Sequence, residues 1–321
     1  MDITEVESFV PLRDGARLRV KLLGRDKTRP LLIALHGAQG VADHREPLSS
    51  FTFLSDQFRL LVFDARGSGK SDDKGPFTHQ QWVSDVEELR EWAGASTCLV
   101  AGGSYGGMVA LEYALAYPRR VSALILRDTW ANGVLGMMSC LKAVLTNPRI
   151  QPDAERQLRV WSGNTRDDDD LASGFAEIVP IYTPDPEKVA SSSTDDAGRN
   201  PSAPPLKLDI HHATHNFCFT NNQPRFDLRT QLKNINVPTL VVCGRHDPIT
   251  PVMFSEEIAR LIPNAQLAIF EDSGHSPPAD EPEAFQKTVR DFLGRCESEQ
   301  SDDRGGWLET EACYYSLVTT K

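Results

Sequence analysis

The sequence predicts an α/β fold: a mostly parallel sheet of eight strands, helices on both faces of the sheet and an inserted, mostly helical segment. Short apolar runs alternate with stretches of helical periodicity over residues 30–129 and again over residues 231–296. Such alternation indicates a parallel sheet covered on both faces, because each connection between parallel strands returns through a helix. The alternation is absent from residues 130–230, which indicates that this segment is an insertion.

The 321 residues are expected to form one core domain with two additions. Residues 1–129 and 231–296 are assigned to the core, whose size suits a single large α/β domain. Residues 130–230 are assigned to a cap over the carboxyl edge of the sheet. Within the cap, a serine- and proline-rich stretch at residues 191–205 predicts a surface loop. Residues 297–321 are polar and are expected to form a C-terminal tail.

Local patterns predict the core elements in chain order. An Asp-Gly turn inside residues 10–23 predicts an opening antiparallel hairpin. Continuous apolar runs are typical of buried parallel strands. They occur at residues 30–35, 59–63, 97–101, 121–126, 238–244 and 266–270. Helical periodicity fills the intervals between these runs. It occurs at residues 45–57, 79–93, 108–115, 252–262 and 281–295.

Composition and charge narrow the class of protein. The formal net charge of −11 argues against nucleic acid or an anionic membrane as a partner. The chain has no apolar run of about 18 residues that predicts a membrane-spanning helix. Residues 1–7 lack the positive start and apolar core of a signal peptide. Cys98 and Cys243 fall within apolar strands, so we expect reduced thiols. These features predict a cytoplasmic protein.

The most informative segment is residues 102–107, Gly-Gly-Ser-Tyr-Gly-Gly. It lies between a predicted strand and a predicted helix, and a serine on such a sharp strand-to-helix turn is a nucleophile elbow. The turn lifts the hydroxyl of Ser104 clear of the sheet, and the helix N-terminus adds backbone N–H groups and a positive dipole end. Ser104 is therefore the candidate nucleophile; the alternative is a plain glycine-rich turn.

A serine hydroxyl becomes a good nucleophile only when a base takes its proton. His275 follows the last predicted strand, and Asp247 follows the strand before it. The carboxyl ends of parallel strands meet at one edge of a sheet, so these residues and Ser104 are candidates for a catalytic triad. Asp128, just beyond residues 121–126, is the alternative acid.

The negative charge that develops in such a reaction needs two fixed donors. We assign them to the backbone N–H of Tyr105, which follows the candidate nucleophile, and to the N–H of Ala38. Three histidines of the predicted cap are close in sequence but lack cysteine or carboxylate partners at ligand spacing. They are His211, His212 and His215. We interpret them as a cap surface or a wall of the substrate site, and we expect no metal and no cofactor.

These motifs resemble the α/β-hydrolase superfamily, and within it the proline iminopeptidase-like branch (peptidase family S33). The order serine, aspartate, histidine along the chain is that of the superfamily. Residues 102–114, Gly-Gly-Ser-Tyr-Gly-Gly-Met-x-Ala-Leu-Glu-Tyr-Ala, are similar to the elbow of that branch. The resemblance covers residues 10–295, and it implies the same triad and a mostly helical cap.

The resemblance implies a serine hydrolase that acts on a small molecule with an ester, lactone or amide group through an acyl-enzyme. Three alternatives remain open. The first is an aminopeptidase that releases an N-terminal proline or another residue. The second is acyl transfer or cyclisation by the same triad, and the third is a non-enzymatic ligand receptor.

Two segments depart from the pattern of the branch. Residues 36–40 are His-Gly-Ala-Gln-Gly, where the branch has His-Gly-Gly-Pro-Gly. His215 stands where the branch is expected to have a cap carboxylate for the free amine of its substrate. Burying an ammonium group without a carboxylate is costly. We therefore interpret His215 as a substrate-binding residue and favour an ester or amide over a free-amine peptide.

Overall fold

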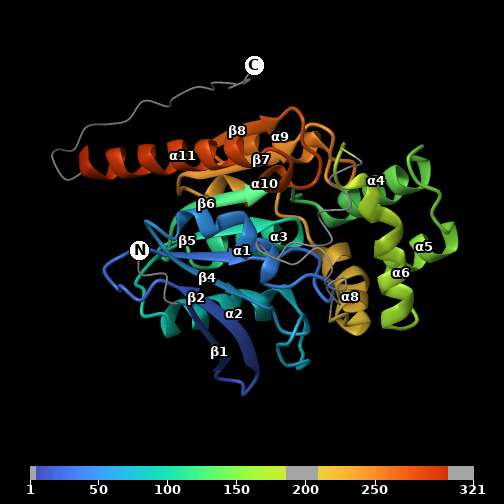
Figure 1. Cartoon of the computed structure of the whole chain (residues 1–321), viewed down its shortest axis with the longest axis horizontal. Coiled ribbons are helices and arrows are strands. Elements are labelled where there is room, and N and C mark those ends of the chain that lie inside the picture. Colours follow the sequence, from blue (N-terminus) through green and yellow to red (C-terminus); the bar gives the residue numbers. More distant parts are fainter. Residues whose placement is uncertain (1–4, 186–208, 303–321) are drawn as a thin grey trace, which may run out of the picture.

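The computed structural model describes residues 5–185 and 209–302, the last six of them by their backbone alone. Its centre is an eight-stranded sheet in the order β1-β2-β4-β3-β5-β6-β7-β8 (Figure 1). The pairs β1–β2 and β2–β4 are antiparallel, and all the other pairs are parallel. The strands are β1 (Glu5–Pro11), β2 (Arg17–Leu23), β3 (Leu31–Leu35), β4 (Arg59–Phe63), β5 (Cys98–Gly103), β6 (Val121–Arg127), β7 (Thr239–Gly244) and β8 (Ala265–Phe270). The predicted fold class is confirmed.

Helices cover both faces of the sheet because its central strands are apolar on both sides. They are α1 (Arg45–Phe51), α2 (His79–Trp92), α3 (Tyr105–Ala116), α9 (Val252–Leu261), α10 (Pro277–Asp280) and α11 (Pro282–Asp302). Every residue of β3 is buried. Leu31 and Ile33 pack in a core cluster with α2, α3 and α9, whereas Leu32 and Ala34 pack in a second cluster with α1 and α11. Successive side chains of a strand point to opposite faces, so one continuous apolar run serves both layers.

The segment between β6 and β7 is mainly helical where the structure describes it. Its α-helices are α4 (Gly133–Thr146), α5 (Ala154–Ser162), α6 (Asp168–Ile178) and α8 (His212–Phe217). A π-helical turn, Cys218–Asn222, follows α8. These helices gather beyond the carboxyl end of the sheet (Figure 1). We refer to residues 130–230 as the inserted segment; that they form a separate cap stays a prediction.

Two elements differ in length from the sequence prediction. The helix expected over residues 45–57 is α1, which ends at Phe51 and passes into a short 3₁₀ turn at Thr52–Leu54. Helix α11 continues to Asp302, beyond the expected end of the core at residue 296. The loop predicted at residues 191–205 and residues 303–321 of the predicted tail lie outside the described residues. No helix of the described chain combines the length and hydropathy that a membrane crossing needs.

Glycine at the elbow lets three backbone segments approach one another closely. A Cβ atom at Gly102 would lie 2.3 Å from the carbonyl oxygen of Gly106. A Cβ atom at Gly106 would lie 2.5 Å from the carbonyl oxygen of His36. These are backbone atoms, which cannot rotate away as a flexible side chain can. The packing of β5, α3 and the loop after β3 therefore depends on missing side chains.

We expect alanine to have opposite effects at two glycines. Gly102→Ala should lower the free energy of unfolding by about 1–3 kcal/mol, or prevent folding, because its Cβ meets backbone. Gly294→Ala should raise it by about 0.5–1 kcal/mol, because Gly294 is an exposed position of α11. Apart from the helix's own backbone, no atom of the described residues lies within 4 Å of the new Cβ. Urea unfolding followed by circular dichroism measures both. Equal stability of the Gly102 variant and the wild type would contradict the packing described here.

Candidate active site

Ser104 occupies a strained turn between β5 and α3. Its backbone angles are φ 51° and ψ −123°. Positive φ is rare for a residue with a side chain and costs of order 1–3 kcal/mol. Backbone hydrogen bonds hold the turn: the Ser104 N–H donates to the carbonyl of Arg127 at 2.8 Å. The Ser104 carbonyl accepts from the Thr129 hydroxyl at 2.8 Å. This geometry is compatible with a nucleophile elbow, and the role of Ser104 as nucleophile stays a prediction.

His275 and Asp247 contact each other at the ends of β8 and β7. His275 Nδ1 lies 2.8 Å from Asp247 Oδ2. The other carboxylate oxygen accepts the backbone N–H groups of Ile249 at 2.7 Å and Thr250 at 3.1 Å. The hydroxyl of Thr250 also donates to Asp247 Oδ2. Since a carboxylate only accepts, Nδ1 carries the ring proton, and Nε2 is left with a lone pair that can take a proton.

The two groups of this pair shift each other's pKa. Burial alone would raise the pKa of Asp247, but the charge and hydrogen bond of His275 outweigh burial, and the pKa is lowered. Burial alone would lower the pKa of His275, but the charge and hydrogen bond of Asp247 outweigh it, and the pKa is raised above 6.5. Asp247 thus stabilises a protonated imidazole, as the acid of a triad does.

Asp128, the alternative acid, is fully buried, but it accepts a hydrogen bond from a backbone N–H group and not from the imidazole of His275. Its Oδ1 accepts the N–H of Gly244 at 3.1 Å. Its Oδ2 accepts no hydrogen bond from the described residues, and Nη1 of Arg127 lies 3.6 Å from it. Burial, and next the negative charge of Asp247, raise the pKa of Asp128 to about 7. Of the two candidate acids, Asp247 is the one that contacts His275.

Arg127 joins the elbow to the histidine loop, which we define as residues 271–276. The Arg127 carbonyl accepts the N–H of Ser104, and its Nη1 donates to the carbonyl of His275 at 3.1 Å. Nη2 pairs with Glu46 of α1. A Cβ atom at Gly103 would lie 2.1 Å from this Nη2, so the arginine crosses directly over the elbow strand. Arg127 was not predicted from the sequence, where its signal is a charge at the end of an otherwise apolar strand.

Both candidate oxyanion donors are unused by the described part of the chain. Ala38 has a positive φ of 25°, and Tyr105 is the first residue of α3, where a helix leaves its N–H groups unpaired. Neither N–H donates a hydrogen bond there. A Cβ atom at Gly37 would lie 3.6 Å from Ser104 Oγ, which puts the loop of Ala38 beside the elbow. This geometry is compatible with an oxyanion hole, and the assignment stays a prediction.

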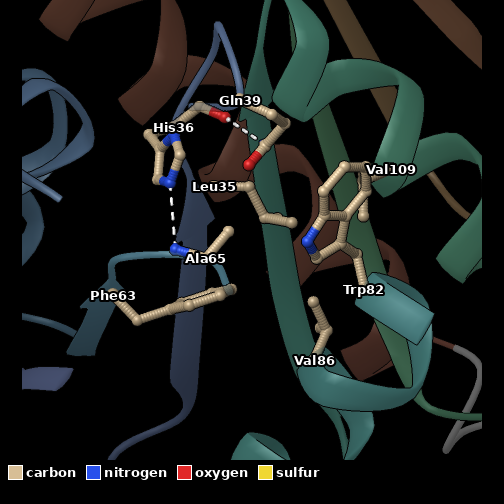
Figure 2. Close-up of a pocket in the computed structure, with 8 residues that line it drawn as sticks. All are labelled: Leu35, His36, Gln39, Phe63, Ala65, Trp82, Val86 and Val109. Atoms are coloured by element: carbon tan, nitrogen blue, oxygen red, sulfur yellow. Dashed lines mark hydrogen bonds between the residues drawn. The ribbon is translucent and has the colours of Figure 1, made fainter. Parts of the chain in front are cut away.

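His36 braces the loop that carries Ala38. Its Nε2 accepts the N–H of Ala65 at 3.0 Å, so Nδ1 carries the proton and donates to the carbonyl of Gly37 at 2.7 Å. Figure 2 shows this imidazole beside a cavity that Gln39 and Trp82 also line. The cavity measures about 10 Å³, which is room for one water molecule at most. It is therefore too small to be the substrate site.

The three histidines at positions 211, 212 and 215 of the inserted segment have separate partners. His211 Nε2 lies 2.9 Å from the carbonyl of Gly69, and His212 Nδ1 lies 2.8 Å from a carboxylate oxygen of Asp168. His215 is 1% exposed, its Nε2 lies 3.0 Å from the carbonyl of Val160, and its Nδ1 has no hydrogen-bond partner among the described residues. Burial lowers the pKa of His215 to about 4, so its ring is neutral at neutral pH. Its role in substrate binding stays a prediction.

A different cluster brings possible metal ligands together. Within the described residues, Asp43, His44 and Asp64 place ligand atoms within 4.8 Å of one another. Arg45 already binds both oxygens of Asp43. His44 Nδ1 and the backbone N–H of Lys70 occupy the two oxygens of Asp64, at 2.6 and 2.9 Å. Protein donors already bond to the carboxylate oxygens of Asp43 and Asp64. These bonds explain the proximity of the three residues without a metal ion.

Comparisons with known proteins agree with the fold. The family model described as the alpha/beta hydrolase fold matches residues 30–282, which is most of the chain. The chain belongs to this family. A proline iminopeptidase of Pestalotiopsis fici is 30% identical over 290 residues, covering 87% of this chain and 97% of the relative. This relative supports the proline iminopeptidase-like branch.

Other relatives in the family are also hydrolases. A putative carbamate hydrolase of Pseudomonas savastanoi is 27% identical, covering 82% of this chain and 93% of the relative. The crystal structure of a hydrolase from Pseudomonas aeruginosa matches with a TM-score of 0.65 and 27% identity, covering 90% of this chain and 98% of the other. An enol-lactonase from Burkholderia xenovorans shares the fold, with a TM-score of 0.68 and 23% identity over 89% of this chain and all of the other. The protein is a hydrolase of the α/β-hydrolase family.

We expect Asp128→Asn to stabilise the protein more at pH 8 than at pH 5. The folded-state pKa of Asp128, about 7, lies above its ordinary value of 3.8, so folding favours the protonated carboxyl. The stability that this contributes is complete below about pH 4 and is lost as the pH rises through about 7. Asparagine stays neutral and keeps the acceptor for Gly244. We expect a gain of about 2–4 kcal/mol at pH 8, at about 1.4 kcal/mol per pKa unit. Urea unfolding at both pH values measures it, and an equal effect at both would contradict the shift.

Proposed function

We propose that the protein is a serine hydrolase that cleaves an ester or amide bond of a small molecule through an acyl-enzyme. The observation that carries this proposal is the Asp247–His275 hydrogen bond of 2.8 Å at the same sheet edge as Ser104. A serine in a plain glycine-rich turn has no need of a buried imidazole oriented by a carboxylate. The proposed site therefore has a nucleophile, a base and the acid that orients the base.

The proposed reaction has two half-reactions. His275 Nε2 takes the proton of Ser104, whose oxygen attacks the carbonyl carbon of the substrate. The N–H groups of Tyr105 and Ala38 bind the resulting oxyanion. His275 then gives its proton to the leaving alcohol or amine, and the acyl group stays on Ser104. Water, deprotonated by the same imidazole, releases the acid, and Asp247 balances the charge of the imidazolium in both half-reactions.

The inserted segment supports a substrate with a neutral acyl group. Two of its partly buried carboxylates already bind arginine: Asp170 pairs with Arg159, and Glu177 pairs with Arg156. His215 is neutral and stacks on Phe219 with ring centroids 4.5 Å apart. A free ammonium group gains nothing from these groups, whereas an ester, lactone or uncharged amide needs no charged partner. The similarity to a proline iminopeptidase favours an aminopeptidase as the second candidate.

We expect a fluorophosphonate to label Ser104 and Ser104→Ala to abolish both labelling and turnover. The elbow exposes this hydroxyl, and alanine has no oxygen to form the acyl-enzyme. Peptide mapping of the labelled protein identifies the serine, and circular dichroism checks the fold of the variant. Labelling of another serine, with the Ser104 variant still active, would refute the mechanism.

The same preparation separates the two candidate activities. The comparison needs kcat/KM for a short-chain p-nitrophenyl ester, prolyl-naphthylamide and its N-acetyl form. We expect the ester and the acetylated amide to react at least as fast as the free-amine compound. A strong preference for the free-amine compound would replace our proposal with the aminopeptidase. Retained binding without turnover of any compound would favour a ligand receptor.

The two aspartates should differ in their effect on the pH profile. His275 must be neutral to act as base, and its pKa is raised above 6.5. We therefore expect kcat/KM for a neutral ester to rise with pH through a midpoint above 6.5. The charge of Asp128 also raises the pKa of His275. Asp128→Asn should then move the midpoint to lower pH and largely preserve kcat.

Asp247→Asn should instead lower kcat by about 10⁴-fold, the loss seen when a serine protease loses its triad acid. An amide at this position can donate to Nδ1 and so favours the wrong tautomer of His275. Steady-state kinetics from pH 5 to pH 9 tests both variants. Equal losses of kcat at the two positions would leave the acid unassigned, and a larger loss at Asp128 would transfer the role to it.

A further inference from the structure

The inserted segment touches the histidine loop directly. Residues 179–183, which we name the strap, follow α6 and begin with a 3₁₀ turn at Val179–Ile181. The N–H of His275 donates to the carbonyl of Tyr182 at 2.6 Å. The ring of Tyr182 packs edge-on against the imidazole, with centroids 5.0 Å apart and planes at 62°. The backbone and the ring of the candidate base thus both contact the strap.

This contact depends on the residue before the base. A Cβ atom at Gly274 would lie 2.2 Å from the carbonyl oxygen of Tyr182 and 3.0 Å from the Cα of Thr183. Any other residue at position 274 would push the strap away from the loop. Glycine here serves the close approach of two chain segments that are about ninety residues apart in the sequence.

A single buried carboxylate binds both segments. Asp280, at the end of α10, is 6% exposed. Its Oδ1 accepts the hydroxyl of Thr183 at 2.6 Å, and its Oδ2 accepts the N–H of Gly274 at 2.8 Å. One oxygen thus holds the strap and the other holds the histidine loop. Hydrogen bonds to a charged acceptor are shorter and stronger than neutral ones, so this carboxylate fixes the spacing between the two segments.

Arg149 secures the other side of the strap. It lies just beyond α4, and its two terminal nitrogens donate to the carbonyls of Pro180 and Thr183, each at 2.7 Å. Together with the bond from His275 to Tyr182, three of the five strap carbonyls accept a donor from outside the strap. The strap is therefore held between the helices of the inserted segment and the histidine loop.

We propose that Thr183 and Asp280 are positioning residues for His275, and that the strap is part of the machinery that aims its imidazole. Asp247 fixes the Nδ1 side of the ring from the core of the protein. The strap fixes the backbone amide and one edge of the ring from the inserted segment. A displacement of a catalytic group by about 1 Å can lower the rate by about a hundredfold. This inference rests on the proposed function, because it assigns positioning residues to His275, the base of the proposed reaction.

The test compares Thr183→Val, Thr183→Ser and Asp280→Asn with the wild type. Valine keeps the shape of threonine and removes the bond to Asp280, whereas serine keeps the hydroxyl. Thr28→Val is a control for the loss of a threonine–carboxylate bond elsewhere: Thr28 donates to Asp26 at 2.6 Å at an exposed position before the amino end of β3. The measurements are kcat and KM for the best ester, the rate of fluorophosphonate labelling of Ser104, and the unfolding midpoint.

We expect Thr183→Val and Asp280→Asn to lower kcat and the labelling rate by about ten- to a hundredfold, with KM changed by less than about threefold. Thr183→Ser should restore wild-type rates, and Thr28→Val should leave them unchanged. All variants are assayed below their unfolding midpoints. Asp280→Asn tests the proposal independently if the valine variant does not fold.

Three results would overturn the inference. Wild-type rates in both Thr183→Val and Asp280→Asn would show that the strap does not aim the base. Failure of Thr183→Ser to restore the rate would show that packing matters and the hydroxyl does not. A loss confined to KM would make the strap a binding element. Absence of labelling at Ser104 in the wild type would instead refute the proposed function itself, so the two failures are distinguishable.

Discussion

Parallel pairing of β3, β5, β6, β7 and β8 makes these strands run in one direction, so the loops that leave their carboxyl ends share one edge of the sheet. Each candidate group lies within a few residues of such an end: Ala38, Ser104, Asp128, Asp247 and His275. The parallel register of these strands thereby brings the loops that carry these groups to one edge of the sheet. The loops themselves need only turn sharply, and the chain does so with glycine and with positive φ.

Strain is concentrated at that same edge. The non-glycine residues with positive φ in the described chain are Ala38, Ser104 and Asp128. Two of them are hydrogen-bonded to a neighbouring strand. The N–H of Ser104 donates to the carbonyl of Arg127, and the N–H of Asp128 donates to the carbonyl of Val242. A buried sheet can impose such conformations because many other contacts fix its strands. Strained backbone and buried charge therefore coexist where the proposed chemistry takes place.

The sequence alone predicted the positions of those candidate residues that directly follow a strand. Ser104 is marked by the glycines around it, and Asp247 and His275 by the apolar runs before them. Sequence alone left Asp128 as a rival acid, because both aspartates follow strands and only the fold shows which one contacts the imidazole. Arg127 and the strap were not predicted. Their roles arise from contacts between segments far apart in the chain, and no local pattern encodes those contacts.

The bond between His275 and the Tyr182 carbonyl also bears on how such proteins diversify. Inserted segments are natural places to change specificity, because they can vary without altering the sheet. In this chain, however, the inserted segment is not independent of the core, because its strap contacts the loop after β8. A recombinant that exchanges residues 130–230 for those of a relative would thus need a matching pair at positions 274 and 280. The strap and the histidine loop would therefore have to be exchanged together.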